Sequence, residues 1–192
     1  MNKIFSLILT LFSLNASATE YLSPRSLALG GAGRAAPMLN DSIYLNPSYG
    51  SFVPSYNLSG GYTWFNGGRT YNASIQDSRT ELFQAGLGFT RREQNAAINL
   101  GASKQAIKDL GIGLGAKIII DDRTNKMSTD TIFSTSFLAT NWFYTSLIID
   151  NIFQSNSSLE RNLYRTFYLA TKFKTLEVVH IFVDPFYSPT YG

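Results

Sequence analysis

The side chains that catalysis and metal binding most often need are scarce in this chain. Its 192 residues include no cysteine and a single histidine, His180. A catalytic triad needs a histidine beside a nucleophile and an acid, and a structural zinc site needs several Cys or His ligands. Multi-histidine and cysteine metal centres are therefore excluded, and no nucleophile–base pair can be read from the sequence. We predict that the protein is not an enzyme and that it uses no cofactor and no metal.

Two motifs indicate ligand chemistry only weakly. Residues 31–36, GAGRAA, match the G-x-G-x-x-A dinucleotide fingerprint, but that fingerprint requires a preceding buried strand, a following helix and a later acidic residue. The sequence around residues 31–36 does not provide this context. Asp121, Asp122 and Asp130 could bind a cation, but they lack the spaced oxygen ligands and central glycine of a calcium loop. A solvated loop explains these carboxylates better.

The elements that must position any site are strands, because apolar and small polar residues alternate from residue 56 onward. In residues 111–120, for example, Ile112 and Leu114 share one face, and the other face carries glycine. Strict alternation of this kind predicts β-strands with two chemically different faces. Eight segments show the pattern: 56–65, 69–77, 83–90, 96–103, 111–120, 133–139, 143–149 and 166–173. A ninth candidate, 176–183, is strand-like by its Val and Ile content, but which way its faces point is ambiguous.

The distribution of charge indicates where the apolar faces point. Charged residues make up 15% of the chain, below the roughly 25% of a typical soluble domain, and they concentrate at segment ends. The other faces carry Gly, Ser, Thr, Asn and Gln, as in the lumen of a membrane barrel. We therefore predict an all-β fold, a transmembrane antiparallel β-barrel of about 8–10 strands formed by residues 51–192. A soluble lipocalin-like barrel, with its apolar face inward, is the alternative.

Lys117 is an exception, since it lies in mid-strand on a face that is otherwise glycine. A charge in the lumen could tune a channel or pair with an acidic residue of the N-terminal segment. Arg34 and the pair Arg91–Arg92 could meet lipid phosphate or a carboxylate, although ordinary charge at a membrane edge explains them more simply.

The first 18 residues have the features of a signal peptide. Lys3 gives a positive start, residues 4–14 are largely apolar, and Ala16-Ser17-Ala18 is an A-x-A cleavage site. The apolar run is too short to span a bilayer as a helix, which needs about 20 residues. We predict a signal peptide over residues 1–18 and export of the mature chain.

Residues 19–50, between this signal and the strands, contain a run of Gly and Ala. A backbone with such small side chains can approach other structure closely. We predict that residues 19–50 form a plug or hatch inside the barrel. Asn46-Pro47 favours a turn, and we expect the plug to pass there into the first strand of the wall.

Three spaced elements of the same stretch resemble the start of FadL-like outer-membrane proteins. They are PRSLALGGA (24–32), NDS (40–42) and YLNP (44–47). That superfamily includes long-chain fatty-acid transporters, hydrocarbon channels and PorV-like secretion components. The residues that carry the resemblance, as a plug and turn motif, are Arg25, Gly30, Gly31, Ala32, Asn46 and Pro47.

The sequence also departs from the pattern of that superfamily. Ala28 stands where a glycine is usual, and Ser48-Tyr49 replace the Ala-Gly that follows the Asn-Pro. The alternating segments are fewer than the strands of the superfamily's barrels. This implies either a compact relative of about eight to ten strands or a truncated reading frame.

The resemblance implies a role in the bacterial outer membrane, with its lipid as a partner. We expect uptake or passage of hydrophobic small molecules such as fatty acids. A non-transporting barrel, either structural or associated with secretion through periplasmic partners, is the alternative. The formal charge of +3 is small and no Lys/Arg-rich block occurs, so a nucleic-acid partner is not expected.

Overall fold

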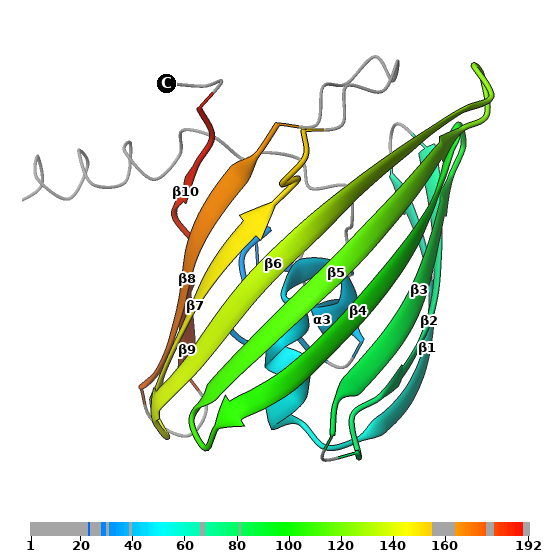
Figure 1. The fold of residues 1–192 in the computed structure, drawn as a ribbon. Helices are drawn as coiled ribbons and strands as arrows, with labels where there is room; N and C mark the ends of the chain where they lie inside the picture. The colour runs from blue at the N-terminus through cyan, green and yellow to red at the C-terminus, as the bar shows by residue number, and fades with distance from the viewer. Residues whose placement is uncertain are drawn as a thin grey trace, which may run out of the picture.

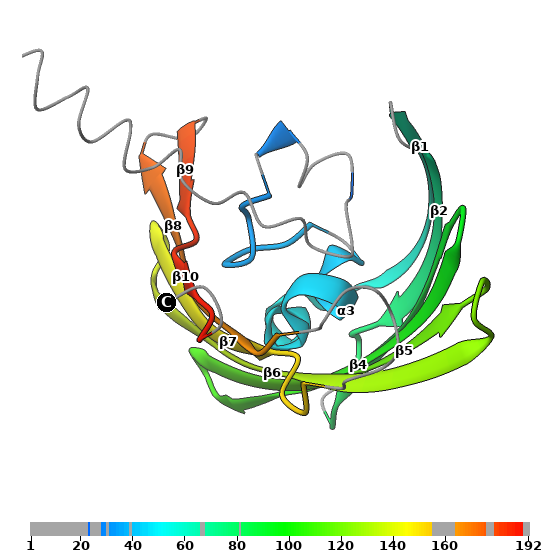
Figure 2. The same cartoon turned by 90° about the horizontal axis from the view of Figure 1, so that it is seen from above.

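The computed structural model describes residues 23, 28–29, 31–38, 40–65, 68–80, 82–154, 164–175 and 179–189. In these residues ten antiparallel strands form one curved sheet (Figure 1). A short helix, α3 (Asp41–Leu45), and a 3-10 helix, η1 (Pro47–Phe52), lie on its concave side (Figure 2). None of the helices in this part of the chain is long and apolar enough to cross a membrane. The predicted all-β antiparallel fold is confirmed.

From β1 to β8, each strand pairs with the next one along the chain. The strands are β1 (Tyr56–Phe65), β2 (Gly68–Asp77), β3 (Gln84–Arg92), β4 (Asn95–Ile107), β5 (Leu110–Asp121), β6 (Lys126–Thr140), β7 (Phe143–Asp150), β8 (Thr166–Thr175), β9 (Val179–Val183) and β10 (Phe186–Tyr187). Each of the eight alternating segments corresponds to one of the strands from β1 to β8, and the segment predicted from its Val and Ile content corresponds to β9. The two-residue β10 was not predicted.

Two short strands share the last position of the sheet. β9 pairs with the second half of β8, and β10 pairs with the first half. Asp184-Pro185 separates them, and the Pro185 carbonyl accepts a hydrogen bond from the Leu169 amide at 3.0 Å. Proline cannot donate to a ladder, so it is tolerated at an edge or a break but not inside a central strand. The ten strands thus fill nine positions.

The sheet is not closed into a barrel, contrary to the prediction. Within the described residues β1 pairs with β2 alone, and β9 and β10 pair with β8 alone. Figure 2 shows these two edges apart. Because every neighbouring pair is antiparallel, β1 in the first position and β9 in the ninth run in the same direction. The two edges therefore cannot be joined by the antiparallel ladder that connects the other strands.

The two faces of the sheet have opposite polarity. On β5 the side chains of Ile112 and Leu114 are 41% and 59% exposed, whereas Gly111 and Gly113 face the concave side and are buried. The lipocalin-like alternative requires the apolar face to point inward, so it does not describe this sheet. Exposed apolar side chains of the convex face include Leu58, Tyr62, Trp64, Tyr71, Ile75, Leu87, Phe89, Leu100, Phe137, Leu147 and Leu169.

Residues 31–38 and 40–52, called the inner segment below, lie against the concave face (Figure 2). Glycines of the wall leave the room for this segment. A Cβ atom on Gly113 would lie 2.2 Å from the Ser48 amide nitrogen, and one on Gly88 would lie 2.3 Å from the Tyr44 hydroxyl oxygen. Both distances are far inside van der Waals contact, so no side chain fits there while the inner segment is in place. The glycine pattern of β3 and β5 thus serves the packing of the inner segment.

The Asn46-Pro47 turn has a different place from the one predicted. It joins α3 to η1, with Pro47 as the first residue of the 3-10 helix, and β1 begins only at Tyr56. Proline suits the first position of a helix because its φ is fixed near the helical value and its missing N–H is not needed there. The inner segment therefore continues through η1 before the wall starts.

Gly113→Ala should destabilise the fold, because the new methyl group would collide with the backbone of Ser48 and not with the end of a flexible side chain. Overpacking of this kind costs about 1–3 kcal/mol. Gly61→Ala is the matched control, since a Cβ atom on this strand glycine meets nothing within 4 Å. Urea unfolding should show a lowered midpoint for Gly113→Ala only. Equal midpoints for the two variants would contradict the steric role of Gly113.

Candidate functional site

Asn46 is the centre of a buried polar cluster that joins the inner segment to the wall. Its side chain is fully buried. Its Nδ2 donates to the Ser136 and Ser146 hydroxyls at 3.0 and 3.1 Å and to the Arg34 carbonyl at 2.8 Å. Its Oδ1 accepts a hydrogen bond from the Ser48 hydroxyl at 2.6 Å. Because Ser136 belongs to β6 and Ser146 to β7, one amide side chain connects the inner segment to two strands of the wall.

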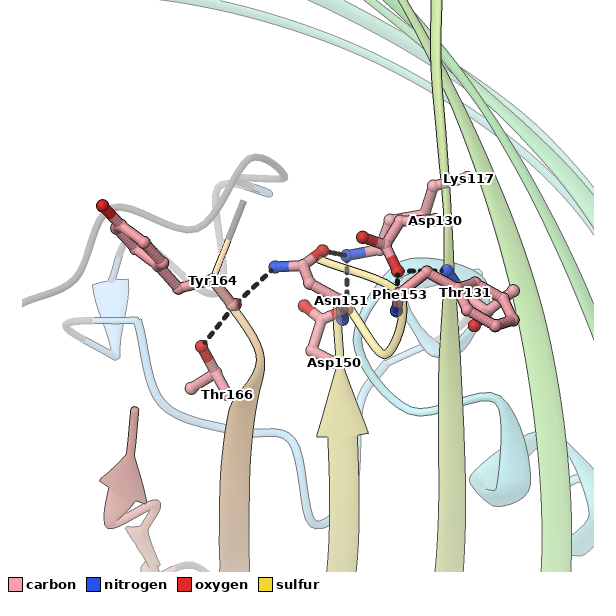
Figure 3. Close-up of polar contacts among 8 residues, drawn as sticks. All are labelled: Lys117, Asp130, Thr131, Asp150, Asn151, Phe153, Tyr164 and Thr166. Atoms are coloured by element: carbon pink, nitrogen blue, oxygen red, sulfur yellow. Dashed lines mark hydrogen bonds and ion pairs between the residues drawn. The ribbon is translucent and has the colours of Figure 1, made fainter. Parts of the chain in front are cut away.

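Lys117 forms a second polar cluster on the same face of the wall (Figure 3). Its Nζ lies 2.5 Å from Asp150 Oδ1 and 3.3 Å from the side-chain oxygen of Asn151. The lysine comes from β5 and the carboxylate from the end of β7, and only 8% of the Lys117 side chain is exposed. The sequence suggested an acidic partner in the N-terminal segment. The ion pair in the structure joins Lys117 to an acid of the wall instead.

Asp130 organises the turn beside this ion pair. It is 1% exposed, and its Oδ1 accepts the backbone N–H of Thr131 at 2.7 Å and that of Phe153 at 3.1 Å. Asn151 donates from its side chain to the Tyr164 carbonyl at 3.2 Å (Figure 3). Its φ of 53° lies in the left-handed region, which asparagine tolerates better than most residues. The turn after β7 is thereby held against β6 and the chain that enters β8.

The carboxylates considered for cation binding make separate contacts. Asp121 is buried, not solvated as expected, and it accepts the Arg123 amide at 2.9 Å. Asp122 forms an ion pair with Arg91 at 2.8 Å, while Asp130 serves the turn described above. In the described part of the chain, no group of three His, Cys, Asp or Glu side chains could hold a metal ion.

Arg34 is buried in the inner segment, whereas a charge at a membrane edge was expected. Its guanidinium lies 4.0 Å from the ring centroid of Tyr168, a cation–π contact. Its Nη1 donates to the Gly31 carbonyl at 2.8 Å and lies 3.9 Å from Asp184 Oδ2. The same carboxylate oxygen accepts the backbone N–H groups of Gly33 and Arg34, both at 2.8 Å. Asp184 therefore fixes the start of the inner segment to the break between β9 and β10.

Burial between the inner segment and the wall changes the pKa of two side chains, Asp184 and Tyr44. It raises the pKa of the Asp184 carboxyl group above its ordinary value, although the two N–H donors and the Arg34 charge act in the opposite direction. A carboxyl whose pKa is higher in the folded state stabilises the fold most in acid, and this contribution is lost as the pH rises through the folded value. Burial also raises the pKa of Tyr44 to about 12. The Tyr44 phenol thus stays protonated and donates to the Ala73 carbonyl at 3.2 Å.

Two small cavities lie between the inner segment and the wall. The first, of about 30 Å³, is lined by Arg34, Lys117 and other residues. The second, of about 10 Å³, lies beside Ile43 and Gln76. One water molecule needs roughly 10–15 Å³ of such space. In this conformation the cavities suit particles of the size of water and leave no room for a fatty acid.

The predicted site residues lie partly within the described chain. Arg25, Gly30 and the predicted signal peptide (1–18) fall outside the described residues. Gly31 has a φ of 89°, a conformation that glycine adopts without steric cost. The other predicted positions are distributed over the start of the inner segment, its α3–η1 junction and the wall: Ala32, Asn46, Pro47 and Lys117.

The wall residues that hold the inner segment were not predicted. Ser136 and Ser146 occupy inward positions, and the alternation assigned such residues to the polar face without saying which of them meet Asn46. Asp184 did leave a signal, because an acid followed by proline interrupts the last strand pattern. That signal indicated a break in the strand but not the contact with the inner segment.

Comparison with known proteins adds no family to this description, since no family model, no curated protein and no solved structure matches the chain. The resemblance to FadL-like proteins therefore stays a prediction.

Asn46→Ala should be strongly destabilising, because it removes the donor to the Arg34 carbonyl and to two buried serine hydroxyls. Since each buried polar group left without its partner costs about 1–3 kcal/mol, the free energy of unfolding should fall by about 2–4 kcal/mol. Asn57→Ala is the control, because the Asn57 side chain donates only to the neighbouring Ser55 hydroxyl among the described residues. Chemical denaturation compares the two variants. A loss no larger than that of the control would refute the anchoring role of Asn46.

Proposed function

We propose that the protein is embedded in the bacterial outer membrane and takes part in the passage of hydrophobic small molecules such as fatty acids. The sheet would be the wall and the inner segment the hatch. The observation that carries this proposal is the inverted polarity of the sheet, with apolar side chains on the convex face and polar groups buried on the concave face. Soluble proteins rarely expose a continuous apolar surface of this extent. Transmembrane strands present such a surface to lipid.

Aromatic side chains at the ends of strands support a membrane position. Trp64 near the end of β1 is 75% exposed, and Trp142 just before β7 is 56% exposed. Because β1 and β7 run in the same direction, these two residues mark opposite rims of the sheet, as interfacial aromatic belts do. Strands β1, β2 and β8 have ten residues each, within the 9–11 or so that a tilted transmembrane strand needs.

A membrane position requires partners for both edges of the sheet. Unpaired backbone N–H and C=O groups cost several kcal/mol each in lipid, so β1 and the β9–β10 edge would have to be hydrogen-bonded. Since the first and ninth positions run in the same direction, an all-antiparallel closure requires an odd number of further strands. The proposed transmembrane barrel therefore includes strands beyond the described sheet.

The inner segment closes the concave side in this conformation. The cavities beside it are of the size of water, and its backbone is interlocked with the glycines of the wall. Passage of a fatty acid along this face therefore requires the inner segment to move. The contacts that must break are hydrogen bonds, chiefly those of Asn46 and Asp184.

Leu114→Lys tests the membrane position. Leu114 is 59% exposed on the convex face, so in water a lysine there should change the stability by no more than about 0.5 kcal/mol. In lipid, a lysine costs about 2–4 kcal/mol near the bilayer midplane and about 0–1 near an interface. Ile107→Lys, at the end of β4, is the matched control. Folding into phospholipid vesicles, read from the gel mobility of unheated samples, should fall for Leu114→Lys only; equal yields would argue against a membrane position.

Passage can be tested by locking the inner segment to the wall. Ser48→Cys/Ser136→Cys places two thiols where the hydroxyl oxygens lie 2.7 Å apart, and the natural chain has no cysteine to interfere. Uptake of a labelled long-chain fatty acid should fall to the background of cells lacking the protein when this pair is oxidised, and should return on reduction. The control pair, Thr63→Cys/Thr70→Cys, joins opposite residues of β1 and β2 and leaves the inner segment free. Uptake that continues through the oxidised lock would refute passage past the inner segment.

The tight fit of the inner segment favours a second candidate, a non-transporting outer-membrane protein with a structural or secretion-associated role. The two cavities described above, between the inner segment and the wall, are of the size of water. For this candidate, cells would show no fatty-acid uptake in either redox state of Ser48→Cys/Ser136→Cys. The protein would still fractionate with the outer membrane and co-purify with periplasmic or secretion partners.

A further inference from the structure

The concave face of the wall carries a continuous apolar area beside its glycine and serine positions. Five side chains form it, and four of them are at most 5% exposed. They are Ile132 on β6, Ile148 on β7, Tyr168 and Ala170 on β8 and Phe186 on β10, together called the inner patch below. In the strand register Ile148 lies opposite Tyr168, and Tyr168 lies opposite Phe186. Since adjacent strands lie about 4.8 Å apart, the inner patch extends for about 14 Å across neighbouring positions of the sheet.

A short part of the inner segment covers the inner patch. Ala35 packs against it and is 1% exposed, and the Arg34 guanidinium lies 4.0 Å from the ring centroid of Tyr168. Hydrogen bonds at the border hold this cover in place, from the backbone N–H groups of Gly33 and Arg34 to Asp184. To the apolar cluster itself, the inner segment contributes one methyl group, the side chain of Ala35.

The fit between this cover and the inner patch is incomplete. The cavity of about 30 Å³ borders the patch, because Ile148 and Tyr168 are among its lining residues, and Leu45 of the inner segment lines it as well. Protein interiors contain few voids larger than a water molecule. When the inner segment moves away, as passage requires, the patch and the cavity become one apolar surface. Exposure of that surface to water is unfavourable, so it attracts a hydrophobic molecule that covers it again.

Carboxylates dominate the border of the inner patch. On β6, β7 and β8, a charged residue two positions from a member of the patch lies on the same face. These residues are Asp130, Asp150 and Lys172. At the edge of the sheet, Asp184 binds the inner segment from the break between β9 and β10. The border thus has three carboxyl groups and one ammonium group.

The ammonium groups near the inner patch already have partners. Lys117 of β5 lies 2.5 Å from Asp150, and the Lys172 ammonium nitrogen lies 4.9 Å from the ring centroid of Tyr144, a cation–π contact. Arg34 belongs to the inner segment and moves with it. A carboxylate ligand would therefore find no excess of positive charge on this part of the wall, and the attraction for a ligand must come from its hydrocarbon chain.

We propose that the inner patch binds the hydrocarbon chain of the molecule that passes the wall, and that it recognises this chain without an anionic head group. The chain takes the place of Ala35 against Ile148 and Tyr168 when the inner segment moves. Long-chain alcohols and other uncharged hydrocarbon derivatives are then bound at least as well as fatty acids. This site rests on the proposed passage of hydrophobic molecules and specifies where, and by which part, they are held.

Photolabelling of the natural sequence in phospholipid vesicles tests the site. The probe is hexadecanol with a diazirine in the middle of its chain, and mass spectrometry of peptides locates the adducts. Adducts should form on Ile148 and Tyr168 and be lost with an excess of unlabelled hexadecanol, whereas adducts on Leu114 of the convex face, from probe dissolved in the bilayer, should persist. Palmitate should compete no better than hexadecanol. Adducts on the convex face alone, or competition by palmitate that is about tenfold stronger, as a charge-assisted hydrogen bond would give, would overturn the proposal.

Ala35→Gly should strengthen binding, because it removes the methyl group that competes with the ligand and leaves the inner patch itself unchanged. Since burial of one such carbon group corresponds to about a fourfold change in affinity, the half-saturating concentration of hexadecanol should fall by about fourfold. Ala32→Gly is the matched control, since it makes the same change of backbone freedom at a described residue outside the cluster. An equal fall in both variants, or no fall in Ala35→Gly, would contradict the proposal.

Uptake measurements separate this site from the proposed passage. Uptake that is abolished by the oxidised Ser48→Cys/Ser136→Cys pair, in a protein whose inner patch is never labelled, would refute the site and leave passage intact. Saturable labelling of the inner patch in a protein without uptake would support the site and refute passage.

Discussion

The contact between wall glycines and the inner segment is the constraint on which the rest of the structure depends. A Cβ atom on Gly86 would lie 2.6 Å from the Ile43 side chain, and one on Gly111 would lie 2.4 Å from the Ser51 hydroxyl. Only glycine allows the inner segment to lie so close to β3 and β5. The other contacts across the interface, including those of Asn46, follow from this short separation of two backbones.

Close approach also explains why hydrogen bonds, more than apolar packing, hold the inner segment. Serine and asparagine side chains are short enough to bridge two nearby backbones, and each such bond contributes about 1 kcal/mol. Most of the large apolar side chains lie on the convex face, where they are exposed. In a water-soluble sheet that is covered on one side, they would lie on the covered face instead. Most of the buried apolar residues described form two small clusters, one of Ala35, Ile132, Ile148, Tyr168 and Ala170 and one of Ile43, Tyr44 and Leu45.

The sequence predicted those features that depend on neighbouring residues. Alternation is local, so it identified strands β1 to β8 and the two faces of each, whereas the facing of residues 176–183 stayed ambiguous. Helices α3 and η1 have five and six residues, too few to be stable alone, and they form because the wall receives them. Asn46 was identified by its turn motif, but Ser136 and Ser146 lie 90 and 100 positions away, and alternation does not encode such pairings. The open edges likewise depend on strand number and direction, which no single segment contains.

Because the described sheet is open, its curvature must be fixed by something other than closure. Asn40 of the inner segment donates to the carbonyls of Asn57 and Ser74, in β1 and β2, at 3.2 and 3.0 Å. At the other edge, the backbone N–H groups of residues 33 and 34 bind Asp184 between β9 and β10. The inner segment therefore spans the concave side from one edge to the other (Figure 2). Loss of either attachment would free one edge of the sheet from the inner segment, so the contacts that shape the wall also hold the inner segment across its concave face.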